Sequence, residues 1–435
     1  MKKYKNIFPL VLIFLMLIST YLMVSNSAQE AGEYNDCLKN AREYAKQGII
    51  VDALEFYDNA LKMNNSLDVC VEKGKLYLDN NMMSEAIEWG EDIVNKYPKE
   101  PDAYDYLLTS YYTSEDYKEC FRLFEKADKL NISSDTIKKI FNKLEYSYNL
   151  GFRAYDDVSC FSGGFCAVKK EELWGYVDNS GNEKIKNKYK TAGAFFEDTA
   201  FVVSDNDDVC YIDTKGNKKK NIPQELNCKF AGMIINNCVA LYDGSKYAFF
   251  DSDFNKLFGD YDDAVSVNYG FGFVKSGSKW TMIDETGNTI GSNSFDDVVI
   301  DEKIIAFRND RAFVKKDGSY ALIDSSGNLV GDNRFEDVCV FLGEGFAAVK
   351  SNGKWGFVDK NGNFKIEPEY ENARSFSNGL AAVCKDEKWG YIDDTGKLVI
   401  DFQFEECKDI NEQGVAFVKT NKEWITLTLY SKNYK

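Results

Sequence analysis

A short frame, a hydrophobic residue followed by Asp-x-x-Gly, recurs through the second half of the chain. It occurs as "WGYVDNSGN" from Trp174, "VCYIDTKGN" from Val209, "WTMIDETGN" from Trp280, "YALIDSSGN" from Tyr320, "WGFVDKNGN" from Trp355 and "WGYIDDTG" from Trp389, with a weaker copy, "YAFFDSDFN", from Tyr247. A catalytic constellation is normally assembled once, whereas a structural unit can be copied, so the recurrence predicts architecture. At the next position, "EWITLT" keeps Trp424 but lacks the Asp and the Gly, which makes seven full units and an incomplete eighth.

Each unit has two further landmarks. An apolar segment such as "FAAVKS" or "LAAVCK" precedes the frame, and an aromatic residue with two mostly acidic residues follows it, as in "YDDVSCF" and "FEDVCVF". Short apolar segments bounded by turn residues are typical of β-strands. A unit of about 35 residues is therefore expected to be an antiparallel meander. Closing such units into a ring protects their unpaired edges, so we expect a β-propeller of seven or eight blades, with a β-solenoid as the alternative.

This arrangement resembles the WG repeat, also called the KWG repeat, of bacterial proteins. The resemblance covers residues 151 to about 430, and Lys354-Trp355-Gly356 and Lys388-Trp389-Gly390 match the motif in full. Val209, Tyr247 and Tyr320 stand where the tryptophan is expected. The resemblance implies a binding or surface module with no common reaction.

The repeated residues are better explained by structure than by chemistry. Glycine adopts positive φ at the end of a tight turn, and aspartate accepts backbone N–H bonds within it. Calcium is the competing interpretation, but the bidentate glutamate of an EF-hand is absent at the required spacing. We interpret the tryptophans as residues that pack between neighbouring units rather than as sugar platforms, and the glycines after them as points of close backbone approach. The structural repeat positions are Trp174, Gly175, Asp178, Gly181, Asp213, Gly216, Asp251, Trp280, Asp284, Gly287, Asp324, Gly327, Trp355, Gly356, Asp359, Gly362, Trp389, Gly390, Asp393 and Gly396.

Acidic pairs follow the aromatic landmark in several units. They are Asp156 and Asp157, Asp262 and Asp263, Asp296 and Asp297, and Glu336 and Asp337. Because they occupy corresponding turns, they could form a negatively charged ring on one face. We expect instead that they are simply solvated, as most surface carboxylates are.

Residues 33–150 have apolar positions at helical spacing and an internal repeat. Ala53, Ala86 and Cys120 are 33 and 34 residues apart, and two further sets keep the same register: Ala60, Ile93 and Ala127, and Ala41, Gly74 and Leu108. The period and the small residues at helix crossings resemble the tetratricopeptide repeat, over about residues 34 to 133. Residues 133–150 are predicted to form a capping helix with Ser133 or Ser134 at its N-cap. The array is either a binding surface or a spacer.

Residues 1–28 have the plan of a secretory signal or an uncleaved signal anchor. Lysines precede an apolar run from Ile7 to Val24, and polar residues follow it. The run approaches the roughly 20 residues that cross a bilayer and exceeds the usual apolar length of a cleaved signal. We therefore expect a membrane anchor with the remaining chain, including a β domain over 151–435, outside the cytoplasm. Cleavage after Ser27 or Ala28, and secretion, is the alternative.

Composition excludes several classes of function. The net charge of −17 disfavours nucleic acid as a partner, and the absence of histidine removes triads and the usual zinc ligands. The 11 cysteines contain no Cys-x-x-Cys pair, and we interpret most of them as buried free thiols. Neither a metal site nor a cofactor is expected.

We expect a non-enzymatic, exported or membrane-anchored surface protein that binds protein or cell-envelope glycan. The alternatives are a propeller-type hydrolase that uses a carboxylate pair, and a purely structural spacer. A ligand site is expected where the copies differ. The most irregular stretches are residues 202–211 and 299–313.

Overall fold

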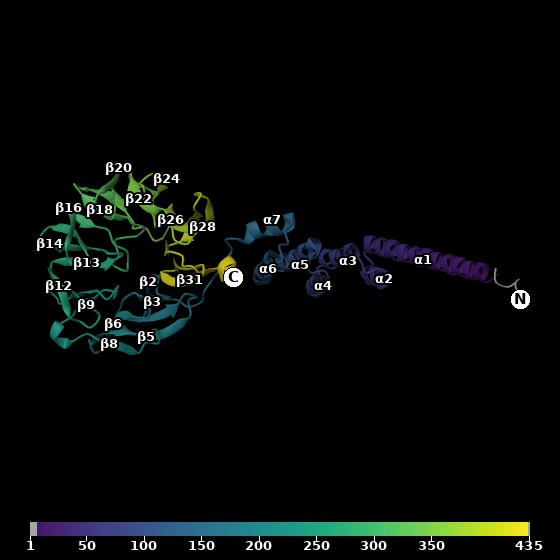
Figure 1. Ribbon diagram of the computed structural model, residues 1–435, viewed down its shortest axis with the longest axis horizontal. Helices are drawn as coiled ribbons and strands as arrows, with labels where there is room; N and C mark the ends of the chain where they lie inside the picture. The colour runs from purple at the N-terminus through teal and green to yellow at the C-terminus, as the bar shows by residue number, and fades with distance from the viewer. Residues whose placement is uncertain (1–6, 309, 344, 434–435) are drawn as a thin grey trace. The chain divides into compact units, whose positions relative to one another are not determined.

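The computed structural model describes residues 7–308, 310–343 and 345–433, and the chain divides into two compact units between Glu145 and Tyr146. The first unit is helical and the second consists mainly of β-sheet (Figure 1). From the sequence we expected the boundary between residues 150 and 151. That position is five residues after the observed boundary and lies inside the β-rich unit.

The helical unit contains three helix pairs and a final helix. The helices are α1 (Ile7–Gln47), α2 (Ile50–Met63), α3 (Leu67–Asp79), α4 (Met83–Lys96), α5 (Pro101–Thr113), α6 (Tyr117–Lys129) and α7 (Asp135–Leu144). The small residues predicted at the crossings are fully or almost fully buried: Ala53, Ala86 and Cys120 have no exposed surface. Ser134 is the N-cap of α7, and its Oγ accepts the N–H of Ile137.

The predicted capping helix is shorter than expected. It ends at Leu144, and residues 148–150 form a β-strand instead. The reason is tertiary, because this strand pairs with the last strand of the chain.

The prediction of an N-terminal membrane anchor is wrong. Among the residues that the structure describes, none of the helices is both long enough and apolar enough to cross a bilayer. The apolar run is not a helix of its own: it is the first part of α1, which continues through polar and charged residues to Gln47. The membrane partner and the membrane localisation expected from that run are corrected with it. The lysines at positions 2, 3 and 5 lie outside the described residues.

The β-rich unit is a succession of antiparallel meanders of three or four strands, which we number as repeats 1 to 8. Repeat 1 contains β2 (Asp157–Ser162), β3 (Phe165–Lys170), β4 (Leu173–Asp178) and β5 (Glu183–Ala192); repeat 2, β6 (Ala200–Ser204), β7 (Val209–Ile212) and β8 (Lys218–Asn221); repeat 3, β9 (Phe230–Ala231), β10 (Val239–Tyr242), β11 (Tyr247–Phe250) and β12 (Lys256–Tyr261); repeat 4, β13 (Asp263–Asn268), β14 (Phe271–Ser276), β15 (Lys279–Asp284) and β16 (Thr289–Phe295).

The second half continues this order. Repeat 5 contains β17 (Asp297–Val298), β18 (Ala312–Lys316), β19 (Ser319–Ile323) and β20 (Leu329–Phe335); repeat 6, β21 (Asp337–Val338), β22 (Ala347–Ser351), β23 (Lys354–Val358) and β24 (Phe364–Tyr370); repeat 7, β25 (Asn372–Ala373), β26 (Leu380–Lys385), β27 (Lys388–Asp393) and β28 (Leu398–Phe404); repeat 8, β29 (Glu406–Cys407), β30 (Val415–Thr420) and β31 (Glu423–Leu429). A 3-10 turn (Gln224–Leu226) precedes β9, and α8 (Tyr430–Asn433) follows β31.

The sheets follow one another around a common centre (Figure 1). Repeats 1 and 2 share a seven-stranded sheet because β5 pairs with β6, and the other repeats form separate four-stranded sheets. The incomplete eighth repeat is completed by a strand that precedes the first repeat in the sequence. Its fourth strand is β1 (Tyr148–Leu150), which pairs antiparallel with β31.

Aromatic residues connect consecutive repeats near the centre. The residues that lead from the first to the second strand of a repeat, its inner segment, place an aromatic ring against the preceding repeat. Phe341 stacks on Phe313 with ring centroids 5.7 Å apart, and Phe376 lies 4.9 Å from Phe357. The same contact joins the first repeat to the last, because Phe161 of β2 stacks on Phe417 of β30 at 5.7 Å. Aromatic packing therefore joins consecutive repeats and also joins the first repeat to the last.

The pairing of β1 predicts where the β-rich unit must begin to be stable. A fragment of residues 146–435 retains β1, whereas a fragment of residues 151–435 loses the pairs of β1 with Leu427, Thr428 and Leu429 and keeps the bonds of Gly151 and Tyr155 to β31. We expect the longer fragment to be more stable by roughly 2 kcal/mol, the contribution of a few backbone hydrogen bonds. Urea unfolding of both fragments measures the difference. Equal midpoints would contradict the closing role of β1.

Candidate functional site

The repeated tryptophans pair across strands with the aromatic landmark of their own sheet. Trp174 lies opposite Tyr189, Trp280 opposite Phe295, Trp355 opposite Tyr370, and Trp389 opposite Phe404. Trp280 and Trp355 are buried, and Trp174 and Trp389 are half-buried. These rings are therefore occupied by packing: besides its pair within the sheet, each ring belongs to a hydrophobic cluster that includes residues of the next repeat, as expected.

The glycines that follow the tryptophan lie against the backbone of the next strand. At Gly390 a Cβ atom would come 2.4 Å from the carbonyl oxygen of Ile400, and at Gly356 it would come 2.6 Å from that of Ile366. Gly175 has the same environment, 2.4 Å from the carbonyl oxygen of Ile185. In repeat 3, Ala248 replaces the glycine, and a glycine, Gly259, stands opposite it.

Each aspartate of the frame holds its own turn. Asp213 Oδ1 accepts the N–H groups of Lys215 and Asn217, at 2.8 and 2.9 Å, and the residue at the turn's end, Gly216, has φ of +78°. The same two bonds recur at Asp178, Asp251, Asp284, Asp324, Asp359 and Asp393. The other turn glycines, Gly181, Gly287, Gly327, Gly362 and Gly396, also have positive φ.

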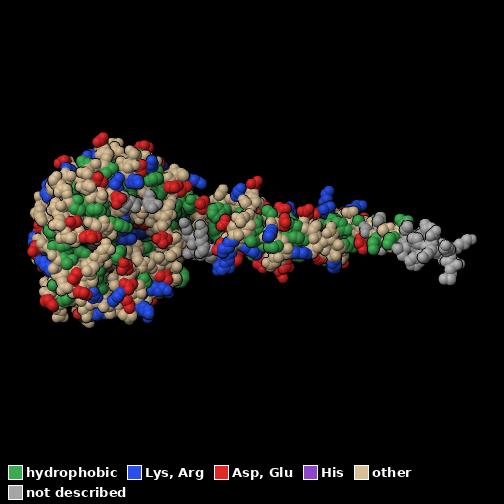
Figure 2. Space-filling view, viewed as in Figure 1, with side chains coloured by type: hydrophobic (Ala, Val, Ile, Leu, Met, Phe, Trp, Pro, Cys, Tyr) green, Lys and Arg blue, Asp and Glu red, His purple; other side chains and the backbone are tan. Residues whose placement is uncertain are grey.

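The acidic pairs have a structural role that the sequence did not reveal. Asp262 Oδ2 accepts the N–H of Gly277 at 2.7 Å, and Asp263 Oδ1 accepts the N–H of Ala264 at 2.9 Å. Equivalent bonds to a hairpin turn are made by Asp156, Glu336, Glu371 and Glu405. These carboxylates are thus turn acceptors, and they also remain exposed to solvent, as expected. Figure 2 shows acidic and basic side chains interspersed over the visible face of the β-rich unit.

A polar cavity of about 910 Å³ lies where the inner segments of repeats 1, 5, 6, 7 and 8 converge. None of the repeated Trp, Gly and Asp positions lines it. Its charged lining residues are Asp301, Glu302, Lys303, Arg374, Asp409 and Glu412. Of the two irregular stretches noted in the sequence, 299–313 contributes to this lining and 202–211 does not.

An insertion in repeat 5 brings charge into this cavity. Residues 299–308, which we call the plug segment, form an extra turn in which Asp301 Oδ1 accepts the N–H groups of Lys303 and Ile305. Ile304 stands where the frame has glycine and has φ of +60°, a strained conformation for a β-branched residue. Ile305 packs with Met233 and Ile235 of repeat 3.

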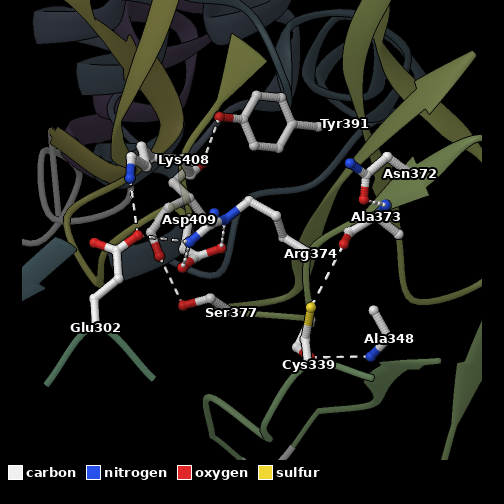
Figure 3. A network of polar contacts seen from close by, with 12 residues as sticks. Glu302, Cys339, Ala348, Asn372, Ala373, Arg374, Ser377, Tyr391, Lys408 and Asp409 are labelled. Carbon is white, nitrogen blue, oxygen red and sulfur yellow. Dashed lines mark hydrogen bonds and ion pairs between the residues drawn. The ribbon is translucent and has the colours of Figure 1, made fainter. Parts of the chain in front are cut away.

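The other contacts of the plug segment reach repeats 7 and 8. Glu302 Oε1 accepts hydrogen bonds from Lys408 Nζ at 2.8 Å and from Arg374 Nη2 at 3.3 Å (Figure 3). Arg374 also binds Asp409 through two bonds, Nε to Oδ1 at 2.7 Å and Nη2 to Oδ2 at 2.9 Å. The plug segment therefore contacts repeat 3 through apolar packing and repeats 7 and 8 through ion pairs.

Burial and charge act in opposite directions on Arg374. Burial by itself lowers the pKa of the guanidinium, but the carboxylates of Asp409 and Glu302 raise it, and the net pKa is raised. Tyr391 donates a hydrogen bond to the carbonyl oxygen of Lys408 at 2.8 Å, which fixes the backbone beside the ion pairs. The Arg374 guanidinium is thus permanently charged and firmly positioned.

The cysteines do not provide a nucleophile at this cavity. Burial raises the pKa of Cys160 and of Cys339 to about 12, so both thiols are protonated at neutral pH. All 11 cysteines are free, and none is exposed, which confirms their interpretation as buried thiols. In the described part of the chain, no cluster of three or more His, Cys, Asp or Glu residues is placed to hold a metal ion.

The sequence contains a signal that marks Arg374 and Lys408 as unusual. Both stand four residues after the aromatic landmark, where the other repeats have Ser159, Gly193, Val265, Val299 and Cys339. A charge at a position that otherwise holds small or apolar residues marks these two repeats as different.

Comparison with known proteins identifies the repeat. The family model of the WG containing repeat matches residues 154–174, 174–206, 320–355, 355–389 and 389–424. These segments of the β-rich unit are WG repeats, and the resemblance inferred from the Lys-Trp-Gly motifs is confirmed. No curated protein matches the chain.

Solved structures resemble parts of the chain at low identity. The TPR domain of Sgt2 from Aspergillus fumigatus is 19% identical over 26% of this chain and 76% of that chain, with a TM-score of 0.23. Hsv2 from Kluyveromyces lactis is 11% identical over 59% of this chain and 98% of that chain, with a TM-score of 0.39. The WD40 beta propeller domain of Doa1 is 11% identical over 65% of this chain and 97% of that chain, with a TM-score of 0.31.

Close backbone approach predicts that the WG glycine resists substitution. Gly356→Ala is expected to destabilise the protein by about 1–3 kcal/mol, because the added methyl group meets the backbone of Ile366 and Pro368. Gly343→Ala is the matched control, since a Cβ atom there meets nothing within 4 Å. Thermal unfolding compares the two variants, and an equal effect of both would contradict the prediction.

The turn aspartates predict a loss of stability in acid. The pKa of Asp213 is lowered by the hydrogen bonds that it accepts from Asn217 and Lys215. A carboxyl group with a depressed folded pKa stabilises the protein above its unfolded pKa of about 3.9, and this contribution is lost as the pH falls through the folded pKa. Asp213→Asn keeps an acceptor oxygen but does not titrate, so its stability deficit at about pH 7 should shrink at about pH 3. Urea unfolding at both pH values measures the deficit, and a constant value would refute the argument.

Proposed function

We propose, from the premise that the β-rich unit carries WG repeats, that this protein is a non-catalytic binding module whose ligand site is the central cavity. The observation that carries the proposal is the difference between repeated and non-repeated residues. The repeated Trp, Gly and Asp positions are engaged in packing or in turns and do not line the cavity, whereas charged lining residues such as Glu302 and Arg374 belong to no repeated motif.

The finer architecture that we propose is a closed β-propeller of eight blades. Eight meanders follow one another in the sequence, and the first and last are joined through β1 and through the Phe161–Phe417 stack. Closure of this kind removes the unpaired edges that a solenoid would leave at its ends. A central cavity surrounded by inner segments is what such a ring produces.

Of the two expected ligand classes, a protein segment fits the cavity better than a glycan. Sugar rings are usually bound on an exposed aromatic face, and Phe161 is the one aromatic residue among the described lining residues. Its ring is already stacked on Phe417. The lining offers instead backbone groups, hydroxyls and charges of both signs, which suit the polar groups of a polypeptide.

The alternative of a carboxylate-dependent hydrolase receives less support. A glycosidase needs one carboxyl group that donates a proton and a second that acts as base or nucleophile. In this cavity Asp301 is bound to Arg308, and Glu302 and Asp409 are bound to Arg374. Three of the four carboxylates among the described lining residues are therefore already engaged by arginine, and Glu412 alone would not supply the two groups that the reaction needs.

The helical unit supplies a second candidate surface. A groove of about 580 Å³ lies between α3, α5 and α7, and its charged lining residues are Asp68, Glu72, Lys75, Asp102 and Asp105. If this groove binds a partner, the protein is a scaffold with two binding sites. If the helical unit is only a spacer, the groove binds nothing. The proposal for the β-rich unit does not depend on which of these holds.

Selection from a random peptide library against the full-length chain tests the proposed function. Gly343→Trp places a large side chain in the cavity, and Lys365→Trp places the same side chain on the outer strand β24. Selected peptides should bind the wild type and the Lys365→Trp variant, and should lose at least about tenfold in affinity for Gly343→Trp, a change of about 1.4 kcal/mol. Failure to select any peptide, or equal binding to both variants, would refute the proposal.

A further inference from the structure

The turn that carries Glu302 is rigid at its base. Asp301, whose side chain is 5% exposed, accepts two backbone N–H groups of the turn and the guanidinium of Arg308 at 2.9 Å. Ile305, on the other side of the turn, is buried. The backbone around Glu302 is therefore held in place, and only the Glu302 side chain is left to change its rotamer.

Glu302 is bound less completely than the other carboxylate of the network. One oxygen, Oε1, accepts both the Lys408 and the Arg374 hydrogen bond, and its side chain is 32% exposed. Asp409 uses both oxygens in a bidentate pair with Arg374, and its side chain is 14% exposed. A bidentate pair is the stronger and more specific arrangement. The Glu302 carboxylate is thus the one that a ligand can replace.

Lys408 needs a carboxylate at this point, whereas Arg374 would keep its pair with Asp409. The Lys408 side chain is 14% exposed and the Arg374 side chain 25% exposed, so both are largely removed from water. Leaving a buried cation without a partner is costly. If Glu302 turns away, the site favours another carboxylate in its place.

We propose that Glu302 occupies, from within the chain, a carboxylate site formed by Arg374 and Lys408, and that an acidic peptide binds by placing a side-chain carboxylate there instead. This inference rests on the proposed function, because it names the chemistry of the ligand that the central cavity takes. Asp409 remains bound to Arg374 throughout and orients the guanidinium (Figure 3). The cavity, at about 910 Å³, has room for several residues of a peptide.

Glu302 then acts as an intramolecular competitor. The apparent affinity for a ligand is reduced by the fraction of molecules in which the site is already occupied. Removing the charge of Glu302 without changing its size frees the site. Glu302→Gln should therefore bind an acidic peptide more tightly than the wild type does.

Fluorescence anisotropy with the full-length chain tests this, with a labelled tetraglutamate peptide amide as the probe. Glu302→Gln is expected to bind it at least about tenfold more tightly than the wild type. Glu412→Gln is the matched control: Glu412 lines the same cavity, makes no ion pair among the described residues, and its substitution changes the net charge equally. The control should bind as the wild type does. In the Glu302→Gln background, Lys408→Met should abolish the gain.

Two further peptides define the source of the carboxylate. A tetraglutamine amide should not bind, and a tetraglutamine peptide with a free C-terminal carboxylate should bind more weakly than tetraglutamate. Glu302→Asp keeps the charge on a shorter side chain and should have intermediate affinity, which provides a second variant if Glu302→Gln unfolds. Circular dichroism melting curves identify any variant that does.

Several outcomes would overturn the inference. They are an unchanged affinity of Glu302→Gln, an equal gain for Glu412→Gln, a gain that survives Lys408→Met, and binding of either tetraglutamine peptide as tight as that of tetraglutamate. The failure of this inference is distinguishable from failure of the proposed function. Library peptides that lose affinity for Gly343→Trp but bind wild type and Glu302→Gln equally would leave the proposed function standing and reject the role of Glu302.

Discussion

The pairing of β1 with β31 is the contact on which the β-rich unit depends. Each repeat is a small meander with an unpaired edge and little core of its own. The first and last repeats would be the exposed ends of the series without this pairing and without the stack of Phe161 on Phe417. Three residues just before the first repeat thus complete a sheet whose other strands lie at the end of the chain.

The centre is also where the repeats stop being equivalent. Repeat 5 contains an additional turn, and its Ile305 packs on repeat 3 while its Glu302 binds residues of repeats 7 and 8. An ion pair between residues separated by 106 positions in the chain links elements that no strand pairing connects. The plug segment thereby stabilises the centre and at the same time concentrates charge there. This combination makes it the natural place for a ligand that must be recognised by charge.

Stability and recognition are assigned to different residues in this unit. Trp389 pairs with Phe404, Gly390 permits the approach of Ile400, and Asp393 holds its turn. In the fold they are fully engaged, and none of them lines the cavity. Arg374 and Glu302 belong to no repeated motif. The contact between them is one that a ligand carboxylate could replace.

The sequence by itself determined the units and their local form. The recurrence of Asp-x-x-Gly predicted the tight turns, because one acceptor oxygen and one glycine with positive φ are sufficient to make such a turn, and both act over a few residues. The period of small residues such as Ala53 and Ala86 predicted the helix crossings for the same reason: the constraint is local and is repeated.

Only the tertiary structure decided how the ends meet and what lies at the centre. Tyr148 to Leu150 were expected to extend a helix, and their strand conformation depends on a partner at the far end of the chain. The apolar run from Ile7 was expected to be an anchor, but it is part of the longer helix α1. The ion pairs of Glu302 with Arg374 and Lys408 join repeats 5, 7 and 8, whose residues lie far apart in the sequence. A sequence pattern describes residues that are near one another in the chain. It therefore could not predict contacts between residues that are far apart in the sequence.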